Sequence, residues 1–317
     1  MNEKIAVVIP CFKARDYILK VLGDIGPEVS RIYVIDDQCP QHTGQHVREK
    51  CNDPRVSIIK NETNQGVGGA VIAGYRQALQ EGADIIVKMD ADGQMDPRML
   101  PKLVKPIIDH RADYTKGNRF YDVGQLSSMP KHRLFGNAVL SLFSKLSSGY
   151  WDIMDPTNGY TAIHAKILKL LPLNKIARRY FFESDMLFRL NTVRAVVMDI
   201  PMQAKYTDEY SSLNVWHVLL EFPLKHLVCL LKRLFYNYFL REFNIATIEL
   251  MAGTLLFVSG AAYGAHKWYS NALSGITTPS GTVMVAALPV LLGFQLLLSA
   301  LNYDINNVPK KCIHEFL

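Results

Sequence analysis

The sequence predicts an α/β fold with a mainly parallel β-sheet, followed by helices that associate with a membrane. Short apolar runs rich in β-branched residues alternate with helix-length segments up to about residue 205. Beyond that point two long apolar stretches follow each other closely, and the mean hydropathy of the chain, +0.05, is high for a soluble enzyme. Alternating strands and helices indicate βαβ units, and the apolar stretches indicate lipid as their solvent.

Five apolar runs are expected to form strands: Ile5–Ile9, Ile32–Ile35, Val56–Ile59, Ile85–Met89 and Ala195–Ile200. The segments between them, such as Ala70–Gln80 and Pro97–Asp109, have the length of helices. Strands separated in this way form a parallel sheet with helices on both faces, a Rossmann-like arrangement. Because ligands bind at the carboxyl ends of the strands in such sheets, polar residues directly after the runs are the candidates for a functional site.

Composition excludes several classes of protein. The 317 residues include 35 Lys and Arg against 29 Asp and Glu, so the formal net charge is +6, and without a prominent basic block nucleic acid is not expected as a partner. The five scattered cysteines form no C-x-x-C pair, which argues against a zinc ribbon or a disulfide scaffold. The N-terminus lacks the pattern of a signal peptide, so the first domain is expected to stay in the cytosol.

The chain changes character at about residue 213. Residues 213–243 mix aromatic and leucine side chains with basic ones, which predicts amphipathic helices in a membrane interface; an ordinary core helix with exposed charges is the alternative. Apolar stretches at about 245–266 and 282–303 follow. Each holds about 22 residues, enough to cross a hydrocarbon core of ~30 Å, although buried helices of a soluble protein remain the alternative.

Charge around these stretches predicts their orientation. Basic residues lie at their outer ends, whereas the connecting loop has only Lys267. The positive-inside rule therefore places both termini in the cytoplasm and the protein in the cytoplasmic (inner) membrane. The predicted organisation is a cytoplasmic α/β domain (1–212), juxtamembrane helices (213–243), a transmembrane hairpin (244–304) and a cytoplasmic tail (305–317), and a homo-oligomer stays open.

The strongest chemical signal is the run Lys88-Met89-Asp90-Ala91-Asp92-Gly93-Gln94 after a predicted buried strand. Asp90 and Asp92, separated by one residue on the loop, can face one divalent cation, and Gln94 offers an amide oxygen to the same centre. Oxygen ligands suit Mg²⁺ or Mn²⁺, which bridge substrate phosphates. Asp96, directly before Pro97, is expected to cap a helix instead of binding metal.

Further motifs follow the other strands in a fixed order. Pro10 lies at the end of the first predicted strand, Asp36 and Asp37 follow the second, and a glycine-rich segment containing Gly68 opens a helix. The run Lys116-Gly117-Asn118-Arg119 follows a later strand. This order resembles family 2 glycosyltransferases with a GT-A fold. It is most similar to their polyprenyl-phosphate branch, the dolichol-phosphate mannose synthases and bacterial undecaprenyl-phosphate glycosyltransferases, over about residues 4–213.

The resemblance implies roles for these residues. Pro10 and Asp37, supported by Asp36, would line the nucleotide pocket, and Gly68 would shape the donor site; packing at a helix N-terminus is the alternative for Gly68. Asp90, Asp92 and Gln94 would hold the metal on the donor diphosphate. Arg119 would approach a donor or acceptor phosphate, and Asp155 would orient the acceptor or interact with the sugar. Glu183 or Asp185 would contact the sugar or lie beside the reacting centre; capping of a helix is the alternative for Asp185.

Three more residues are candidates for substrate binding. The resemblance assigns Arg133, with Asn137 one turn further along an apolar helix, to the acceptor phosphate. Lys205, in a segment that resembles the family's closing loop, is a further candidate phosphate contact. Plain core packing explains the apolar stripe of that helix equally well.

The resulting hypothesis is an inverting, metal-dependent transfer of a sugar from a UDP- or GDP-sugar to polyprenyl (undecaprenyl) phosphate at the cytoplasmic leaflet. Two alternatives remain at this stage. One is a membrane-anchored glycosyltransferase that extends a glycan or a lipid-linked oligosaccharide. The other is a non-enzymatic scaffold on a decayed transferase domain, which the intact Asp90, Asp92, Gln94 and Arg119 disfavour.

Overall fold

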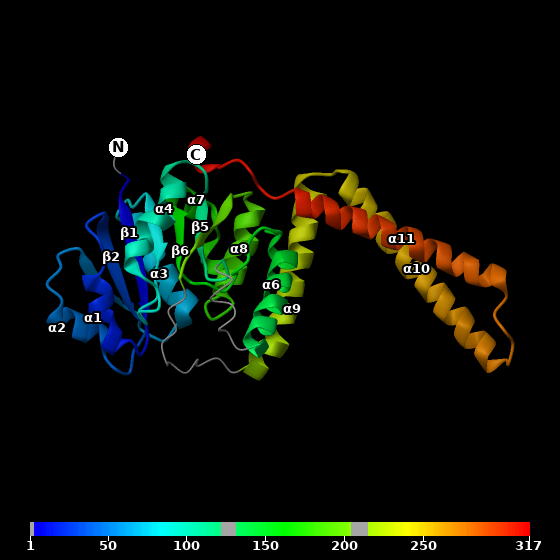
Figure 1. Ribbon diagram of the computed structural model, residues 1–317, viewed down its shortest axis with the longest axis horizontal. Helices are drawn as coiled ribbons and strands as arrows, with labels where there is room; N and C mark the ends of the chain where they lie inside the picture. The colour runs from blue at the N-terminus through cyan, green and yellow to red at the C-terminus, as the bar shows by residue number, and fades with distance from the viewer. Residues whose placement is uncertain (1–2, 122–130, 204–214) are drawn as a thin grey trace. The chain divides into compact units, whose positions relative to one another are not determined.

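The computed structural model describes residues 3–121, 131–203 and 215–317, with backbone alone for 131–135 and 215–220. The chain forms two compact units (Figure 1). The first consists of Met1–Leu231 together with Pro309–Leu317, and the second of Lys232–Val308. The C-terminal residues therefore belong to the same unit as the N-terminal domain.

A seven-stranded sheet forms the centre of the first unit, in the order β3-β2-β1-β4-β6-β5-β7. Among the strands that the structure describes, β6 alone runs antiparallel to its neighbours, β4 and β5, so the prediction of a mainly parallel sheet is confirmed. The strands are β1 (Ile5–Cys11), β2 (Val29–Asp36), β3 (Val56–Lys60), β4 (Ile85–Lys88), β5 (Tyr114–Asn118), β6 (Thr161–His164) and β7 (Val197–Pro201).

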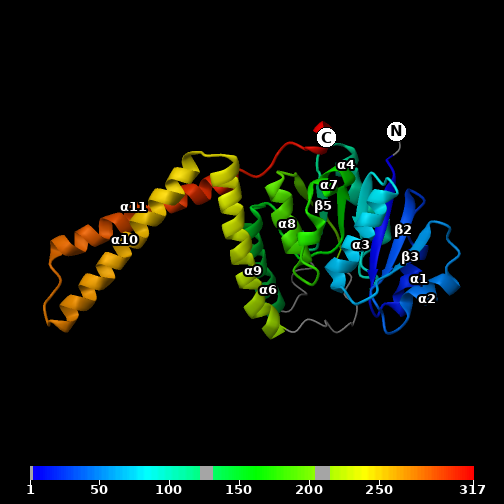
Figure 2. The same ribbon diagram turned by 180° about the vertical axis from the view of Figure 1, so that it is seen from behind.

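Helices cover both faces of this sheet (Figure 2). Side chains of α1, α2 and α4 join Val7 and Ile9 in one core, whereas α3 packs on the other face, where Gly74 approaches Val8 and Ile35. Burial on both faces explains why the strands are continuous apolar runs. The helices are α1 (Arg15–Gly23), α2 (Thr43–Lys50), α3 (Gly66–Gln80), α4 (Leu100–Ile108), α6 (Lys131–Ser148), α7 (Ala165–Leu170) and α8 (Phe182–Thr192).

Helix α9 (Val215–Phe235) runs from the first unit into the second and ends in a π-helical turn at Tyr236–Arg241. One side of it packs through Phe222 and Cys229 against Phe181 and Phe188. Its other side exposes an apolar stripe at helical spacing, formed by Leu224, Leu227, Val228 and Leu231. This helix is therefore apolar on both sides, as expected of a helix whose outer side contacts lipid.

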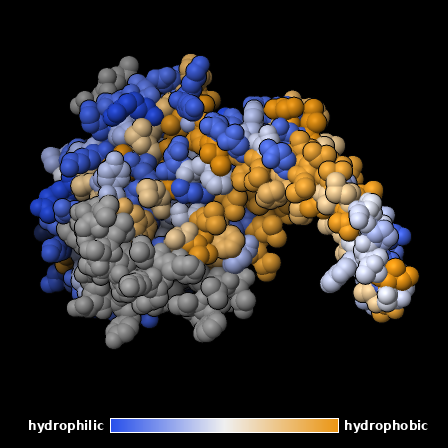
Figure 3. Space-filling model, turned by 45° about the vertical axis from the view of Figure 1, so that its right-hand side comes forward, coloured by the Kyte–Doolittle hydropathy of each residue, from blue (hydrophilic) through white to orange (hydrophobic). Residues whose placement is uncertain are grey.

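Two long helices, α10 (Ile245–Leu273) and α11 (Ser280–Asn306), make up most of the second unit, and both are long and apolar enough to cross a membrane. The two helices approach each other closely at Gly293, which has no Cβ. A Cβ at this position would lie only 2.5 Å from the Phe257 nitrogen and 2.8 Å from the Gly253 oxygen. Glu249 accepts a hydrogen bond of 2.7 Å from Ser299 on the facing helix. Figure 3 shows the mostly hydrophobic surface of this hairpin.

The structure differs from the sequence-based expectations in three places. The apolar helices extend beyond the predicted 245–266 and 282–303, since polar residues of the connecting turn continue α10 to Leu273. Strand β6 was not expected, because four residues in the middle of a sheet carry no recognisable alternation. Lys116 to Asn118 lie within β5, not after it.

Candidate active site

The carboxyl ends of β1, β2, β4, β5 and β7 lie at one edge of the sheet, together with the first residue of the antiparallel β6. The loop from Asp90 to Gln94 leaves β4 at this edge. Gly93 has a φ of +75°, which glycine adopts freely, and the backbone nitrogen of Gln94 donates to the Asp92 carboxylate at 2.9 Å. Asp96 caps the following 3₁₀ turn, as predicted.

Lys88 is a buried cation beneath this loop. Its Nζ lies 2.8 Å from Asp90 and 3.2 Å from Glu183, and it donates to the carbonyl oxygen of Gly159 at 3.2 Å. Burial by itself would lower the pKa of Lys88, but the attraction of the two carboxylates outweighs it and raises the pKa above the ordinary value. Lys88 therefore stays charged and brings Asp90 and Glu183 together.

Arg119 and Asp155 form a second ion pair at the same edge. Arg119 Nε donates to Asp155 Oδ2 at 2.8 Å and Nη2 donates to Oδ1 at 3.0 Å, a two-point contact. Burial would raise the pKa of the enclosed Asp155, but the hydrogen bonds from Arg119 outweigh this effect and hold it below its ordinary value. The Arg119 side chain stays 31% exposed, so part of the guanidinium can meet a ligand.

The segment 155–159 joins the two ion pairs. Asp155, at its start, holds Arg119, and Gly159, at its end, accepts from Lys88. A Cβ at Gly159 would collide with Lys88 Nζ and lie 2.7 Å from Asp90 Oδ2, so this backbone lies directly against the carboxylate loop. Between them the buried Lys116 donates to the Asn158 carbonyl, and burial, partly offset by Asp155, lowers the pKa of Lys116 to about 8.

The carboxylates of Asp36 and Asp37, at the end of β2, accept hydrogen bonds from the backbone of neighbouring loops. Asp36 accepts from the nitrogens of Cys39 and Gly44, and so holds the loop that leads to α2. Asp37 accepts from the nitrogens of Gln65 and Gly66 and from the Asn61 amide, and so fixes the N-terminus of α3. Their role toward a nucleotide stays a prediction, and these bonds show that both carboxylates also shape the loops around it.

Pro10 and Gly68 border the same region. Pro10 lies half-buried in β1, one residue before its end. A Cβ at Gly68 would overlap the Ala177 carbonyl oxygen and lie 2.8 Å from the Phe182 ring, so α3 packs tightly against the segment that leads into α8. Gly68 is therefore needed for close packing, which is the alternative considered above. Its role in shaping the donor site stays a prediction.

Of the three residues predicted to bind a phosphate of the substrates, the structure describes the side chain of Asn137 but not those of Arg133 and Lys205. Asn137 lies half-buried on α6. Arg133 lies on the same helix, but its side chain is outside the described residues, as is all of Lys205. Three charged residues of the site were not predicted: Lys88, Lys116 and Asp199. Lysines at the ends of apolar runs were the available signal, since a charge there needs a buried partner.

The sequence pattern that defines the family "Glycosyl transferase family 2" matches residues 6–171, slightly more than half of the chain. The chain belongs to glycosyl transferase family 2. This confirms the resemblance found in the sequence, and the region matched contains β1 to β6, the carboxylate loop and the pair of Arg119 with Asp155.

Relatives of this family 2 glycosyltransferase include proteins that have been named. It is 30% identical over 245 residues to the UDP-N-acetylglucosamine–dolichyl-phosphate N-acetylglucosaminyltransferase of Methanococcus voltae, covering 73% of this chain and 97% of that protein. It is 32% identical over 204 residues to the undecaprenyl-phosphate mannosyltransferase of Micrococcus luteus, covering 63% and 82%.

Solved structures support the fold. Glucosyl-3-phosphoglycerate synthase of Mycobacterium tuberculosis, in complex with Mn²⁺, UDP and glucosyl-3-phosphoglycerate, superposes with a TM-score of 0.53 at 19% identity. The match covers 73% of this chain and 80% of that one. At this identity the likeness concerns the fold alone, and it agrees with the predicted GT-A arrangement.

The donor atoms of the glycosyltransferase fit a hard divalent cation at the carboxylate loop. Asp90, 30% exposed, and the half-buried Asp92 supply carboxylate oxygens, and Gln94 supplies an amide oxygen. No imidazole or thiolate belongs to this set, which suits Mg²⁺ or Mn²⁺ more than Zn²⁺. Lys88, which is buried, contacts Asp90 from the interior of the protein and so orients its carboxylate.

Asp199 of the glycosyltransferase leads to a prediction about pH. It accepts from Asn118 Nδ2 and the Met154 nitrogen, both at 2.9 Å, while its enclosed Oδ1 has no partner among the described residues. Burial raises the pKa of Asp199 to about 6. Between its ordinary pKa and this value the folded state binds more protons than the unfolded state, so the contribution of Asp199 to stability falls as the pH rises.

We therefore expect Asp199→Asn to raise the melting temperature at pH 7.5 by about 2–4 °C and to flatten its dependence on pH between about 4 and 6. Thermal unfolding of the full chain in detergent at a series of pH values measures both. Asp152→Asn, which changes an exposed aspartate nearby, is the control and should leave the melting temperature unchanged. A lower melting temperature of Asp199→Asn at pH 7.5 would contradict the assignment.

A second prediction concerns the two-point contact of Arg119. A lysine cannot reproduce two parallel hydrogen bonds to one carboxylate, so Arg119→Lys should lower kcat/KM by about 10- to 100-fold. Arg98 forms the same type of contact with Asp96 through Nε and Nη2, but its side chain is 77% exposed. Arg98→Lys should therefore stay within about twofold of the wild type, and equal losses in both variants would refute a specific role for Arg119.

Proposed function

We propose that this family 2 glycosyltransferase is membrane-anchored and moves a sugar from a nucleotide-sugar to the phosphate of a polyprenyl lipid, with inversion at the sugar. One observation carries this proposal: a carboxylate loop suited to a metal–diphosphate and an Arg119–Asp155 pair lie at one edge of the sheet, in a chain that also has two helices apolar enough for a membrane. A soluble acceptor would not require such helices.

The names of the relatives point the same way. The proteins of Methanococcus voltae and Micrococcus luteus are named for transfer to dolichyl phosphate and undecaprenyl phosphate. The polyprenol monophosphomannose synthase of Mycolicibacterium smegmatis, 29% identical over 207 residues, is a further relative named in this way. The names differ in the sugar, so the donor of this chain remains open between UDP- and GDP-sugars.

The proposed reaction does not require the protein to remove a proton from the acceptor. A phosphate monoester is already ionised near neutral pH, so its oxygen can attack the sugar without a strong general base. Asp155 and Glu183 then act by position: Asp155 orients Arg119 toward a phosphate, and Glu183 borders the sugar. A Mg²⁺ or Mn²⁺ ion held by Asp90, Asp92 and Gln94 would supply charge neutralisation at the leaving diphosphate.

Membrane contact is proposed to involve more than the hairpin. The exposed stripe of Leu224, Leu227, Val228 and Leu231 on α9 suits the lipid interface, and Lys225 and Lys232 lie beside it on the same helix. Basic residues on this side of the hairpin favour the cytoplasmic leaflet, with both termini in the cytoplasm. Under this proposal the acceptor phosphate and the donor meet on the cytoplasmic side.

The test uses purified full-length protein in detergent with Mg²⁺ or Mn²⁺ and a panel of UDP- and GDP-sugars. Undecaprenyl phosphate is compared with undecaprenol and with a lipid-linked oligosaccharide, and the products are identified by mass spectrometry. We expect a glycosyl-phosphoryl lipid with the phosphate acceptor alone. If the sugar is transferred only to the oligosaccharide, the proposal is wrong and the chain extends a glycan.

A further inference from the structure

The C-terminal tail docks on the first unit at the sheet edge opposite the candidate active site. Asp113, directly before β5, is fully buried there and accepts from the backbone nitrogens of Ile313 and His314 at 3.1 and 3.0 Å. Its Oδ2 also accepts from the Val196 nitrogen at 2.8 Å, and Lys166 Nζ donates to the His314 carbonyl. One carboxylate thus joins the tail to the segments that lead into β5 and β7.

The ring of His314 is held in one orientation. Its Nδ1 lies 2.6 Å from Asp113 Oδ1, and His164 stacks on the ring with centroids 4.4 Å apart and planes at 15°. A neutral His314 that donates from Nδ1 leaves Nε2 as an acceptor, and this atom faces His110 Nδ1 at 2.9 Å. A carboxylate bound to one ring nitrogen of a histidine is the arrangement that orients metal-binding histidines, which bind the ion through the other nitrogen.

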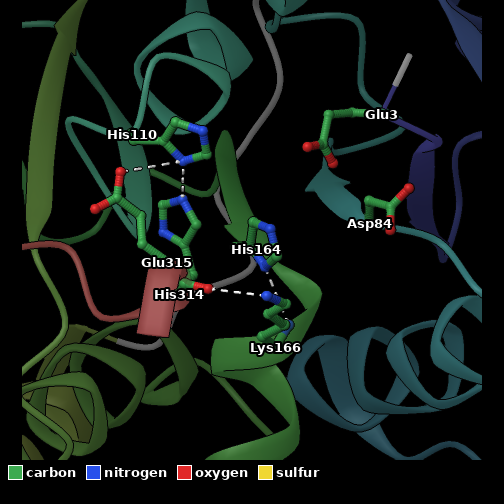
Figure 4. A pocket seen from close by; sticks show the side chains of 7 residues that line it. All are labelled: Glu3, Asp84, His110, His164, Lys166, His314 and Glu315. Atoms are coloured by element: carbon green, nitrogen blue, oxygen red, sulfur yellow. Dashed lines mark hydrogen bonds and ion pairs between the residues drawn. The ribbon is translucent and has the colours of Figure 1, made fainter. Parts of the chain in front are cut away.

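A carboxylate also lies close to the Nδ1 atom of His110. The Glu315 carboxylate is 3.6 Å from His110 Nδ1, so both His314 Nε2 and Glu315 meet this one nitrogen, as Figure 4 shows. These groups border an open hollow of about 390 Å³, which Glu3 and Asp84 also line. The hollow admits water, and its carboxylates outnumber its single lysine, Lys166, which favours a cation.

We propose that His110 Nδ1, His314 Nε2 and the Glu315 carboxylate bind a divalent transition-metal ion, Zn²⁺ in the first place. Two imidazoles and a carboxylate are ligands that Zn²⁺ takes, with water from the hollow in the fourth position. Ligand atoms on one tetrahedral Zn²⁺, at bonds of ~2.0–2.1 Å, lie roughly 3.3 Å apart. Two of the three separations lie on either side of that value: 2.9 Å between His110 Nδ1 and His314 Nε2, and 3.6 Å between His110 Nδ1 and the Glu315 carboxylate. An ion would replace the hydrogen bond between the two imidazoles and draw in Glu315, whose side chain, like that of His110, is half-exposed.

A neighbouring set of ligands is less suitable. Asp113, Cys312 and His314 also bring one donor atom each within 4.8 Å of one another, and all three are buried. The Asp113 oxygens, however, already accept from the nitrogens of Val196, Ile313 and His314. A metal ion there would displace the bonds that dock the tail, whereas an ion at His314 Nε2 leaves them intact.

This site differs in chemistry from the carboxylate loop at the other edge of the sheet. Its imidazoles select transition metals, whereas the oxygen ligands Asp90, Asp92 and Gln94 select Mg²⁺ or Mn²⁺. Its ligands come from positions about two hundred residues apart, the turn after α4 and the tail. The ion would therefore crosslink the tail to the catalytic unit and leave the transfer chemistry to the other site.

The test measures Zn²⁺ binding to untagged, chelator-stripped full-length protein in detergent, by calorimetry and by visible absorption after Co²⁺ substitution. We expect one Zn²⁺ per chain, retained in Asp92→Asn. His110→Asn and Glu315→Gln should each weaken binding at least about tenfold, and Asp113→Asn by about 10- to 100-fold. Asparagine is chosen at position 110 because the φ of His110 is +54°, which asparagine tolerates.

His46→Asn, which removes a half-exposed histidine of α2, is the matched control and should bind Zn²⁺ as the wild type does. Because Glu315 is exposed, Glu315→Gln keeps the tail docked and separates loss of a ligand from loss of the fold. Zn²⁺ binding that is absent, that disappears in Asp92→Asn, or that survives both His110→Asn and Glu315→Gln would overturn the proposal.

Discussion

Asp92→Asn is expected to lower the rate of sugar transfer by about 10³-fold, equivalent to ~4 kcal/mol of transition-state stabilisation. Asp92 lies on the loop that leaves β4, and its carboxylate accepts from the Gln94 nitrogen at 2.9 Å. An amide of the same size keeps that bond but loses the negative charge that attracts the metal. The fold should survive, so the melting temperature should change little while the concentration of Mn²⁺ needed for half-maximal rate rises.

Asp96→Asn in the same loop is the matched control. Asp96 caps the 3₁₀ turn by accepting from the Arg98 nitrogen at 3.1 Å, and asparagine is an equally good cap. This variant should keep the wild-type rate and metal dependence. If Asp92→Asn retains more than a tenth of the rate at saturating Mn²⁺, Asp92 is no metal ligand and the proposed site is wrong.

The positions that sequence predicts well are those where local pattern and chemistry coincide. Asp90 and Asp92 were predicted together because they follow a buried apolar strand, and parallel topology places every such loop at one edge. The continuous runs of β1 and β2 were recognisable for the same reason, since both faces of the sheet are covered. Asp96 followed by Pro97 indicated a helix start directly.

Pairings across long stretches of sequence were not predictable. Lys88 lies in an apolar strand because Glu183, 95 residues later in the chain, reaches it at 3.2 Å. The Arg119–Asp155 pair was predicted as two separate residues, and only the structure shows that one holds the other. His314 was not predicted as a site residue, because its carboxylate partner Asp113 lies directly before β5, about two hundred residues away. Spacing within a motif carries no information about such partners.

The largest effect on stability is expected from Asp304→Asn, in the second unit. Arg233, 2% exposed, donates from Nη1 and Nη2 to the two oxygens of Asp304 at 2.6 and 3.0 Å, and Tyr238 donates to Asp304 Oδ1 at 2.6 Å. This network ties the end of α9 to the end of α11. Removing one charge of a buried pair leaves the other without compensation, which costs about 3–5 kcal/mol.

Thermal unfolding in detergent measures this loss of stability. Asp109→Asn is the control, because Asp109 pairs with exposed Lys105 and Arg111 and should contribute under about 1 kcal/mol.

The double variant Arg233→Met, Asp304→Leu separates the effect of charge from that of packing. If desolvated charge is the cause, the double variant should be more stable than Asp304→Asn, since no ion stays buried. Recovery should be incomplete, because the Tyr238 hydroxyl loses its acceptor. A double variant less stable than Asp304→Asn would show that the cost of an unpaired buried charge is not what destabilises Asp304→Asn.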